Sequence, residues 1–430
     1  MKARIIAAVA LAAALSVVVS TASGGNKSAS QASASKLVVW LQTDAQNGWP
    51  TAVAGATSAF KAQHPGADVE VQYQEWTTHL QKFDASIAAN DVPDVIEMGN
   101  TETSKYMAAR ALSALKAKNY PNSQTWLSGL KQSCTSGGHL YCVPYYAGAR
   151  AVIYRKDLYR SVGVKAPPKT YAKFLAVGKK LMKKYGHNKN FSAFYEPGQN
   201  WYVAMSFVAD YGGQIAVSKG GKWQGTLNTP QAIQALTVFK KMVRSFSRAS
   251  KTTDEAHPYP SIPFAKGRVG SFIGNGWEWP YALDEKLGNP GLANVIGAYP
   301  MPSHTPGKFM PTFLGGSDLA VPVTTKNQSL AVDWIKAFTS TAAEKEIVKG
   351  GQIANTTTLL ASSASNPKLA PFARAAKYSW FVPTSPNWAN VENANVLQDM
   401  LVKIFTGRSS VKAAANSASS QITRILNTGA

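Results

Sequence analysis

The first hundred residues alternate short apolar runs with helical patterns, and this alternation leaves few folds open to the chain. Apolar runs typical of buried strands occur at residues 37–41, 69–73 and 93–98. Residues 49–63 and 77–90, which lie between these runs, have the spacing of helices. This alternation predicts an α/β fold with a mainly parallel sheet covered by helices, whose ligands bind beyond the carboxyl ends of the strands.

A second alternation follows in the middle of the chain. Strands are expected at residues 151–154 and 191–195, and helices are expected to begin near Lys169, near Gln199 and at Pro230. A chain of 430 residues is too long for one compact core. We therefore expect two α/β lobes.

The N-terminus has the composition of an export signal. Lys2 and Arg4 precede an apolar run over residues 5–19, and Ala22 ends a stretch of small residues suited to signal-peptidase cleavage. The apolar run is shorter than the roughly 20 residues that a membrane-spanning helix needs. We therefore expect residues 1–22 to be a signal peptide and the protein to be exported.

The next segment predicts a flexible linker over residues 23–35, which are small or polar apart from Lys27. Ser23 stands where a bacterial lipoprotein would carry a cysteine, so a lipid anchor is not expected.

Two cysteines, Cys134 and Cys142, flank a Gly-Gly turn signal. In an oxidising compartment, a cysteine pair on either side of a hairpin favours a disulfide over a redox or metal site. We expect this disulfide to be structural.

The chain is strongly basic, with 45 Lys and Arg against 23 Asp and Glu and a formal charge of +22. The cations are spread along the chain, with one denser patch over residues 165–189. On a helix, such a run is usually a solvated face. For an exported protein, anionic cell-wall polymers or lipid headgroups are the expected electrostatic partners, and nucleic acid is not expected as a partner.

Motifs of common enzymes are absent from the sequence, which has no Gly-x-Ser-x-Gly elbow, no Walker loop and no His-Glu-x-x-His. The six histidines are scattered without metal-ligand spacing, so neither a metal nor a cofactor is expected. A glycoside hydrolase stays open as an alternative, because Asp44, Glu97, Glu196 or Glu278 can supply a carboxylate pair from distant parts of the sequence.

Residues 269–280 carry the sharpest functional signal. An apolar run ends in an Asn-Gly turn at Asn275 and is followed by Trp277, Glu278 and Trp279. A buried strand that stops at a turn and presents flat aromatic side chains is typical of a stacking platform at a cleft. A sugar ring offers such a platform its apolar C–H face, while its hydroxyls require planar polar groups. We expect Trp277 to stack on a sugar, whereas Glu278 and Trp279 also fit helix-start and core roles.

Several segments spread over residues 36–426 carry a family resemblance, namely residues 36–44, 93–100, 138–146, 152–157, 195–197, 275–279, 313–319 and 407–411. They resemble the extracytoplasmic solute-binding proteins of ABC importers, and among these the sugar binders related to maltose-binding protein. The resemblance implies a two-lobed, periplasmic-binding-protein-like (type II) fold that binds a di- or oligosaccharide and delivers it to the permease subunits. It also implies a monomer that is not an enzyme.

The resemblance also implies where the lobes are divided. Residues 36–146 and 302–350 are expected in lobe 1, and residues 147–301 and 351–430 in lobe 2. Hinges are expected at residues 146–150, 296–301 and 350–356. We expect the lobes to close around the sugar like a clamp. A basic module that binds the cell wall remains a second alternative, and it predicts binding that collapses with salt.

The candidate binding residues follow from strand ends and from the resemblance. At the strand ends of lobe 1 they are Asp44, Asn100 and Thr101, for which helix capping is the competing role. At the first hinge they are Tyr146 and Arg150, for which packing between the lobes is the alternative.

The remaining candidates lie farther along the chain: Glu196 in a turn after an expected strand, Asn200 and Trp201 at a helix start, Asn275 in the stacking turn, Gly315, Gly316 and Asp318 in an apolar run, and Trp388. Capping and packing are the competing roles of Asn200 and Trp201. The glycine pair predicts a close approach of the main chain to the ligand. Trp380 and Trp388 are the candidate substitutes for an aromatic residue that the family carries where this chain has Ala394.

Overall fold

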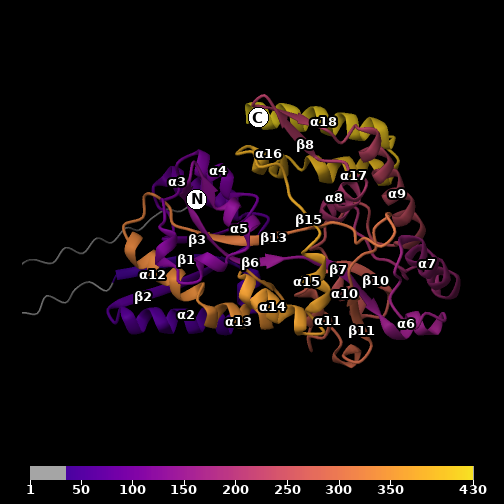
Figure 1. Cartoon of the computed structure of the whole chain (residues 1–430), viewed down its shortest axis with the longest axis horizontal. Coiled ribbons are helices and arrows are strands. Elements are labelled where there is room, and N and C mark those ends of the chain that lie inside the picture. Colours follow the sequence, from indigo (N-terminus) through magenta and orange to yellow (C-terminus); the bar gives the residue numbers. More distant parts are fainter. Residues whose placement is uncertain (1–34, 430) are drawn as a thin grey trace, which may run out of the picture. The chain divides into compact units, whose positions relative to one another are not determined.

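Residues 35–429 are described by the computed structural model of the chain (Figure 1). The expected signal peptide lies outside these residues, as does the expected linker except for Ser35, which begins the first strand. No helix among the described residues has the length and apolar character that crossing a bilayer requires.

A six-stranded sheet contains the predicted strands of the first alternation. Its order is β14-β6-β13-β3-β1-β2. The strands are β1 (Ser35–Gln42), β2 (Ala67–Gln74), β3 (Val95–Gly99), β6 (Cys142–Gly148), β13 (Gly315–Ala320) and β14 (Ile353–Ala354). The apolar side chains at alternate positions of β1 are fully buried, which explains why a short apolar run marked this strand.

The pairing in this sheet is mixed, and the expectation of a mainly parallel sheet is wrong for half of it. β1 is parallel to β2 and β3, with Val39 opposite both Val71 and Val95. β13 is antiparallel to β3 and to β6, and β14 is antiparallel to β6. The α/β crossovers of the first hundred residues enforce parallel pairing, whereas β13 returns from another part of the chain and runs the opposite way.

Helices cover both faces of this sheet: α1 (Thr43–Gly48), α2 (Pro50–Gln63), α3 (His79–Ala89), α4 (Thr103–Ala108), α5 (Ser128–Ser133), α12 (Gln328–Phe338), α13 (Thr341–Lys349) and α14 (Thr357–Ser365). α12 and α13 pack on α2, and Figure 1 shows α3 and α4 on the other side of the strands. The large core side chains here include Phe60, Phe83 and Trp334, which are at most 1% exposed.

A three-stranded antiparallel sheet, in the order β10-β7-β11, forms the second centre of the fold. Its strands are β7 (Arg150–Arg155), β10 (Ser271–Asn275) and β11 (Ile296–Tyr299). The expected strand at residues 191–195 does not form. Ser192 and Tyr195 make only isolated parallel bridges to Val269 and Phe272, because the amide of Phe194 between them donates to the carbonyl oxygen of Phe246 instead.

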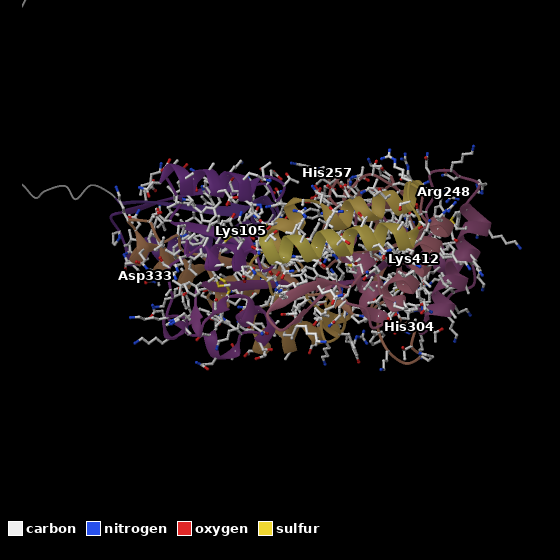
Figure 2. All side chains as sticks on the ribbon, turned by 90° about the horizontal axis from the view of Figure 1, so that it is seen from above. Lys105, Arg248, His257, His304, Asp333 and Lys412 are labelled. Carbon is white, nitrogen blue, oxygen red and sulfur yellow. A yellow bond between two sulfur atoms is a disulfide. The ribbon has the colours of Figure 1, made fainter. Side chains whose placement is uncertain are left out.

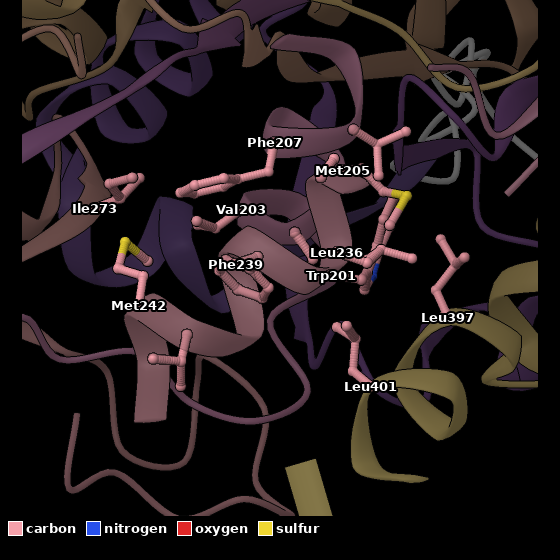
Figure 3. Close-up of a cluster of buried hydrophobic side chains, with 14 of the residues drawn as sticks. Trp201, Val203, Met205, Phe207, Leu236, Phe239, Met242, Ile273, Leu397 and Leu401 are labelled. Atoms are coloured by element: carbon pink, nitrogen blue, oxygen red, sulfur yellow. The ribbon is translucent and has the colours of Figure 1, made fainter. Parts of the chain in front are cut away.

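The second group of helices comprises α6 (Lys156–Ser161), α7 (Tyr171–Tyr185), α8 (Trp201–Asp210), α9 (Pro230–Phe246), α10 (Ser261–Ala265), α11 (Glu278–Ala282), α15 (Ala370–Ala375), α16 (Trp388–Asn393), α17 (Val396–Thr406) and α18 (Val411–Thr428). α9 begins as the sequence predicts, with the Thr229 hydroxyl accepting from the Ala232 amide and with Pro230 in the first turn. Its apolar stripe packs on α8 and α17 through Leu236, Phe239 and Met242 (Figure 3).

Short elements complete the fold: β4 (Thr135–Ser136) with β5 (His139–Leu140), β8 (Ala216–Lys219) with β9 (Lys222–Gly225), β12 (Thr312–Phe313) with β15 (Ser379–Trp380), and the 3₁₀ turns η1 (Ala117–Asn119), η2 (Ser123–Thr125) and η3 (Pro290–Leu292). Cys134 and Cys142 form the expected disulfide, which joins the end of α5 to the start of β6. Asp318 is close to both sulfur atoms, but the sulfurs are bonded to each other and so are not available as metal ligands.

The chain passes between the two sheets along β6 into β7, and back along β12 into β13. The second connection between the sheets was expected at residues 296–301. These residues instead include β11, which pairs with β7 inside the three-stranded sheet, so the chain crosses later, at β12 and β13. Met310 and Phe313 accordingly pack in the core around α8 and α9, although lobe 1 was expected to begin at residue 302. β14, expected in lobe 2, pairs with β6 in the six-stranded sheet.

Candidate functional site

A cavity of about 530 Å³ lies where the two sheets face each other. This volume is within the range of small-molecule sites, about 300–1,000 Å³. Its wall brings together twelve of the predicted residues: Asp44, Asn100, Thr101, Tyr146, Arg150, Asn200, Trp201, Asn275, Trp277, Glu278, Gly315 and Gly316. The residues come from both sheets and from loops that the sequence separates by up to about 270 positions, so the fold itself assembles the site.

Trp277 follows the end of β10 and lies half-buried in the cavity wall. The edges of two tyrosine rings support it, with centroid distances of 4.9 Å to Tyr259 and 5.1 Å to Tyr281. The preceding Gly276 has no room for a side chain, because a Cβ there would lie 2.1 Å from the carbonyl oxygen of Gly351. The Asn-Gly turn therefore places a buttressed indole at the cavity, as the sequence predicts.

Asp44, which follows β1, faces the cavity from the six-stranded sheet. Its Oδ2 atom accepts a hydrogen bond of 2.8 Å from the indole nitrogen of Trp76. Burial raises the pKa of Asp44, and the hydrogen bond from Trp76 only partly offsets this effect. The cavity wall thus carries a carboxylate held in a fixed direction by an aromatic side chain.

Sequence reasoning missed Trp76 and Tyr259, which both line the cavity. Trp76 comes two residues after the carboxyl end of β2, so the strand-end argument that found Asp44 was sufficient to find it. Tyr259 lies in a loop before α10, where no local pattern marks its direction.

Thr101 connects the two sides of the cavity through Glu392, which is on α16. The Thr101 hydroxyl donates to Glu392 Oε2 at 3.2 Å, and the indole nitrogen of Trp388 donates to Glu392 Oε1 at 2.8 Å. Burial and the neighbouring Glu102 raise the pKa of Glu392 to about 8. The predicted Asn100 lies beside Thr101, and its amide donates to the carbonyl oxygen of Leu314.

Among the described residues that line the cavity, Arg150 is the only Lys or Arg. Its guanidinium carbon lies 4.2 Å from the ring centroid of Tyr202 and 5.8 Å from that of Phe313. Tyr202 stacks in turn on Trp201 at 4.0 Å. A cation over an aromatic face is held by the ring quadrupole, so this stack fixes the guanidinium at the cavity.

Carboxyl groups surround this arginine. The side chains of Glu255 and Glu278 line the cavity, and burial raises the pKa of both, that of Glu278 to about 8. Arg150 lowers both pKa values in part. Glu278 Oε2 also accepts from the Ser261 amide at 3.2 Å.

The floor of the cavity is formed by Tyr146 and the glycine pair of β13. A Cβ on Gly316 would lie 2.4 Å from the Tyr146 carbonyl oxygen, which explains the need for glycine at this close approach of two strands. The Ser317 hydroxyl donates to the Tyr146 hydroxyl at 3.0 Å. Beneath it, the carboxylate of Glu97 accepts from the Tyr145 hydroxyl and from the Gln42 amide, and burial raises its pKa to about 7.

Four predicted residues lie outside the cavity wall. Glu196 is 1% exposed and borders a separate cavity of about 310 Å³. Among residues 35–429, no donor meets either of its carboxylate oxygens in good hydrogen-bond geometry, although Asn200 lowers its pKa in part. Asp318 is fully buried and accepts from the hydroxyls of Thr103 and Ser133. Trp279 packs against the core around β7 and β10. Trp388 is fully buried as well. From the same helix, α16, Glu392 lines the cavity in its place.

The site thus combines indole and phenol rings with carboxylates, amides and one guanidinium. Aromatic planes suit the apolar face of a ring, and the planar polar groups suit its hydroxyls.

Comparison with known proteins places this geometry in a family. The family of bacterial extracellular solute-binding proteins matches residues 18–345. The diacetylchitobiose-binding protein DasA of Streptomyces coelicolor is 33% identical over 350 residues, which are 81% of this chain and 80% of that protein. The galactooligosaccharide-binding protein of Bacillus subtilis is 26% identical over 320 residues, 72% of this chain and 70% of that protein.

Two solved structures share the fold. The GacH receptor of Streptomyces glaucescens, solved unliganded and with acarbose, has a TM-score of 0.80 at 18% identity and covers 92% of this chain and 99% of its own. An ABC transporter solute-binding protein of Thermotoga lettingae, bound to α-D-tagatose, has a TM-score of 0.77 at 19% identity. The match covers 91% of this chain and 100% of that protein. The two sheets are thus the centres of the two lobes of a type II periplasmic-binding fold, and the chain belongs to the bacterial extracellular solute-binding proteins.

Proposed function

We propose that this protein binds a short oligosaccharide outside the cytoplasm and delivers it to the permease subunits of an ABC importer. The observation that carries the proposal is the cavity in which Trp277 from one sheet and Asp44 from the other face the same space. A sugar ring stacked on Trp277 would present its hydroxyls to Asp44 and to the carboxylates near Arg150.

The names of two relatives support a sugar ligand, and the 33% identical relative suggests which sugar to test first. That relative binds diacetylchitobiose, a disaccharide of two N-acetylglucosamine units. Net binding at micromolar affinity requires about 8 kcal/mol. Two or three aromatic contacts and a few oriented hydrogen bonds supply this amount after the costs of association.

The charges in the wall favour an uncharged sugar over an acidic one. Six carboxylic acids line the cavity, namely Asp44, Glu102, Asp254, Glu255, Glu278 and Glu392, against the single guanidinium of Arg150. A uronate would add a further negative charge to groups whose pKa values are already raised by burial. The strong positive charge of the whole chain therefore does not extend to its cavity.

We further propose that the protein releases its ligand chemically unchanged and works as a monomer. Incubation with the disaccharide and chromatography of the supernatant tests the first point, since a glycoside hydrolase would shorten the sugar. Sedimentation velocity tests the second.

Closure of the two lobes would trap the sugar. The hydrogen bond from Thr101 to Glu392 joins the two sides of the cavity, and such a contact is available only when they are close. Small-angle scattering is expected to show compaction when ligand is added. An unchanged radius of gyration at saturating sugar would contradict closure.

The decisive experiment is titration calorimetry of the exported chain with β-1,4-linked disaccharides that differ only at carbon 2, carrying a hydroxyl or an acetamide, and with a uronate disaccharide. We expect at least one uncharged disaccharide to bind with a Kd in the micromolar range or below, and the uronate to bind at least tenfold more weakly. Absence of binding by a wide panel of uncharged di- and trisaccharides would refute the proposal.

A further inference from the structure

Although the cations are spread along the chain, most of its net positive charge comes from one stretch in which acids are scarce. Residues 158–253 contain sixteen Lys and Arg and two acids, so this stretch carries +14 of the formal +22. Nine of the cations lie between Arg160 and Lys189, two on the β8–β9 hairpin, and five between Lys240 and Lys251. We call these sixteen side chains the basic face.

The two acids of this stretch do not neutralise the basic face. Glu196 is buried beside the second cavity. Asp210 is turned inward, with only 3% of its side chain exposed, and accepts from Ser303 and from His304. Fifteen of the sixteen cations are exposed and Lys240 is half-buried, and in residues 35–429 none of them forms an ion pair with a carboxylate.

The elements that carry the basic face are neighbours in space. α7 packs on α6 and on α9, and the β8–β9 hairpin packs on α18, which also contacts α9. Residues 400–429, which include α18, also contain cations, Lys412 among them, and no Asp or Glu. Figure 2 shows Arg248 and Lys412 on the same side of the structure, and Figure 1 shows α6, α7, α9 and β8 following one another around the three-stranded sheet.

We infer that the basic face binds a flexible phosphate-bearing polymer at the cell surface, independently of the sugar in the cavity. Long-range attraction to such a polymer needs only a high density of unpaired cations, which this face provides. Lysines predominate over arginines, which suits many diffuse contacts along a polyanion better than one built phosphate site.

Two other anionic partners fit this surface less well. A membrane surface is planar, whereas the cations follow helices and a hairpin that turn around the sheet (Figure 1). Stable attachment to a bilayer also uses apolar side chains, and none of the exposed large apolar residues in the described part of the chain lies in residues 158–253. Single-stranded nucleic acid would require exposed aromatic rings for base stacking, which this stretch also lacks.

The test compares two triple variants with equal changes in net charge. One carries Lys173→Glu, Lys179→Glu and Lys180→Glu on α7. The matched control carries Lys326→Glu, Lys336→Glu and Lys345→Glu, three exposed lysines around α12 and α13 of the other lobe. Binding is measured by fluorescence anisotropy with labelled long-chain polyphosphate, with single-stranded DNA, and by co-sedimentation with vesicles of phosphatidylglycerol and phosphatidylcholine in equal parts.

We expect the unchanged chain to bind polyphosphate more tightly than DNA or vesicles. If about four phosphates are neutralised, affinity is expected to fall about fiftyfold between 50 and 200 mM salt. The α7 variant is expected to lose at least tenfold in affinity and the control no more than about twofold, with both variants keeping the sugar affinity and melting temperature of the parent. An equal loss in both variants would show that only net charge matters, and tighter binding to vesicles or to DNA would assign the face to another partner. Either result overturns the inference and leaves the proposed sugar binding unaffected, because sugar affinity is measured separately.

Discussion

The main chain of Gly276 lies directly against the main chain of Gly351, so that a Cβ on Gly276 would be 2.1 Å from the Gly351 carbonyl oxygen and a Cβ on Gly351 would be 2.8 Å from that of Gly276. Gly276 follows the last residue of β10 in one lobe, and Gly351 precedes β14 in the sheet of the other. The turn that carries Trp277 therefore rests on the opposite lobe, close to the connections between the lobes.

Gly276→Ala is expected to weaken sugar binding and to destabilise the fold by about 2 kcal/mol, because the added methyl group forces the two main chains apart. The measurements are calorimetric titration and thermal unfolding. Gly55→Ala is the control, since Gly55 is inside α2 with open space around it. This control is expected to gain up to about 1 kcal/mol in stability and to bind sugar normally. A Gly276→Ala variant with parental affinity would show that the contact does not position the indole.

Trp277→Ala is expected to reduce sugar affinity by about 2 kcal/mol, roughly thirtyfold, through loss of the stacking surface. Trp279→Ala is the matched control, because Trp279 packs against the core instead of lining the cavity. It is expected to lower the melting temperature but to change the affinity of the folded protein by no more than about threefold. Calorimetry at a temperature where both variants are folded separates the two effects, and the reverse order of losses would contradict the site.

Part of this fold is predictable because its signals are local. β1, β2 and β3 are marked by apolar runs, and the start of α9 by Pro230. The pairing of β13 with β6 and of β12 with β15 is not marked, because the partner strands are far apart in sequence and no local residue pattern specifies them. At residues 191–195 the sequence predicts a strand that does not form. A buried apolar run has the same composition whether or not it pairs with a neighbouring strand, so composition alone does not decide.

The site likewise contains residues that the sequence marks and residues that it does not. Asp44 and Trp277 follow strand ends, where the sequence itself shows which residue comes after the turn. Glu392 was missed in favour of Trp388, its neighbour one helical turn away. Which of the two faces the cavity depends on how α16 packs on α17 and α18, and this is a property of the tertiary structure.

Folding stability is expected to decrease as pH rises from about 5 to about 8. The pKa values of Glu97, Glu278 and Glu392 are raised in the folded protein, to about 7, 8 and 8, above those of exposed glutamates. The folded state thus binds more protons than the unfolded state in this interval, so each group costs stability once the pH passes its unfolded pKa, and the cost levels off above its folded pKa. Melting temperatures measured across this range check the slope.

Glu392→Gln isolates one of these groups, because glutamine keeps the size and polarity of the side chain but cannot ionise. The variant is expected to melt at the parental temperature near pH 5 and several degrees higher near pH 8. Glu285→Gln, at an exposed glutamate, is expected to follow the parental curve at every pH. Parallel curves for Glu392→Gln and its parent would show that this carboxyl titrates normally.

Removing the disulfide through Cys134→Ala and Cys142→Ala is expected to cost about 2.5 kcal/mol in the free energy of unfolding, since the bond closes a loop with a sequence separation of 8. Urea unfolding of the double variant measures the loss. Sugar affinity is expected to be unchanged, because neither cysteine lines the cavity. A large fall in affinity would mean that the bond shapes the floor of the site through β6.

The arginine stacked on Tyr202 also links the binding site to acidity. Arg150 offsets the carboxyl charges of Glu196, Glu255 and Glu278. Without this guanidinium, the pKa values of the three buried acids would rise further, and the wall would stay neutral to a higher pH. Arg150 therefore sets the pH at which the cavity wall begins to present negative charge to a ligand.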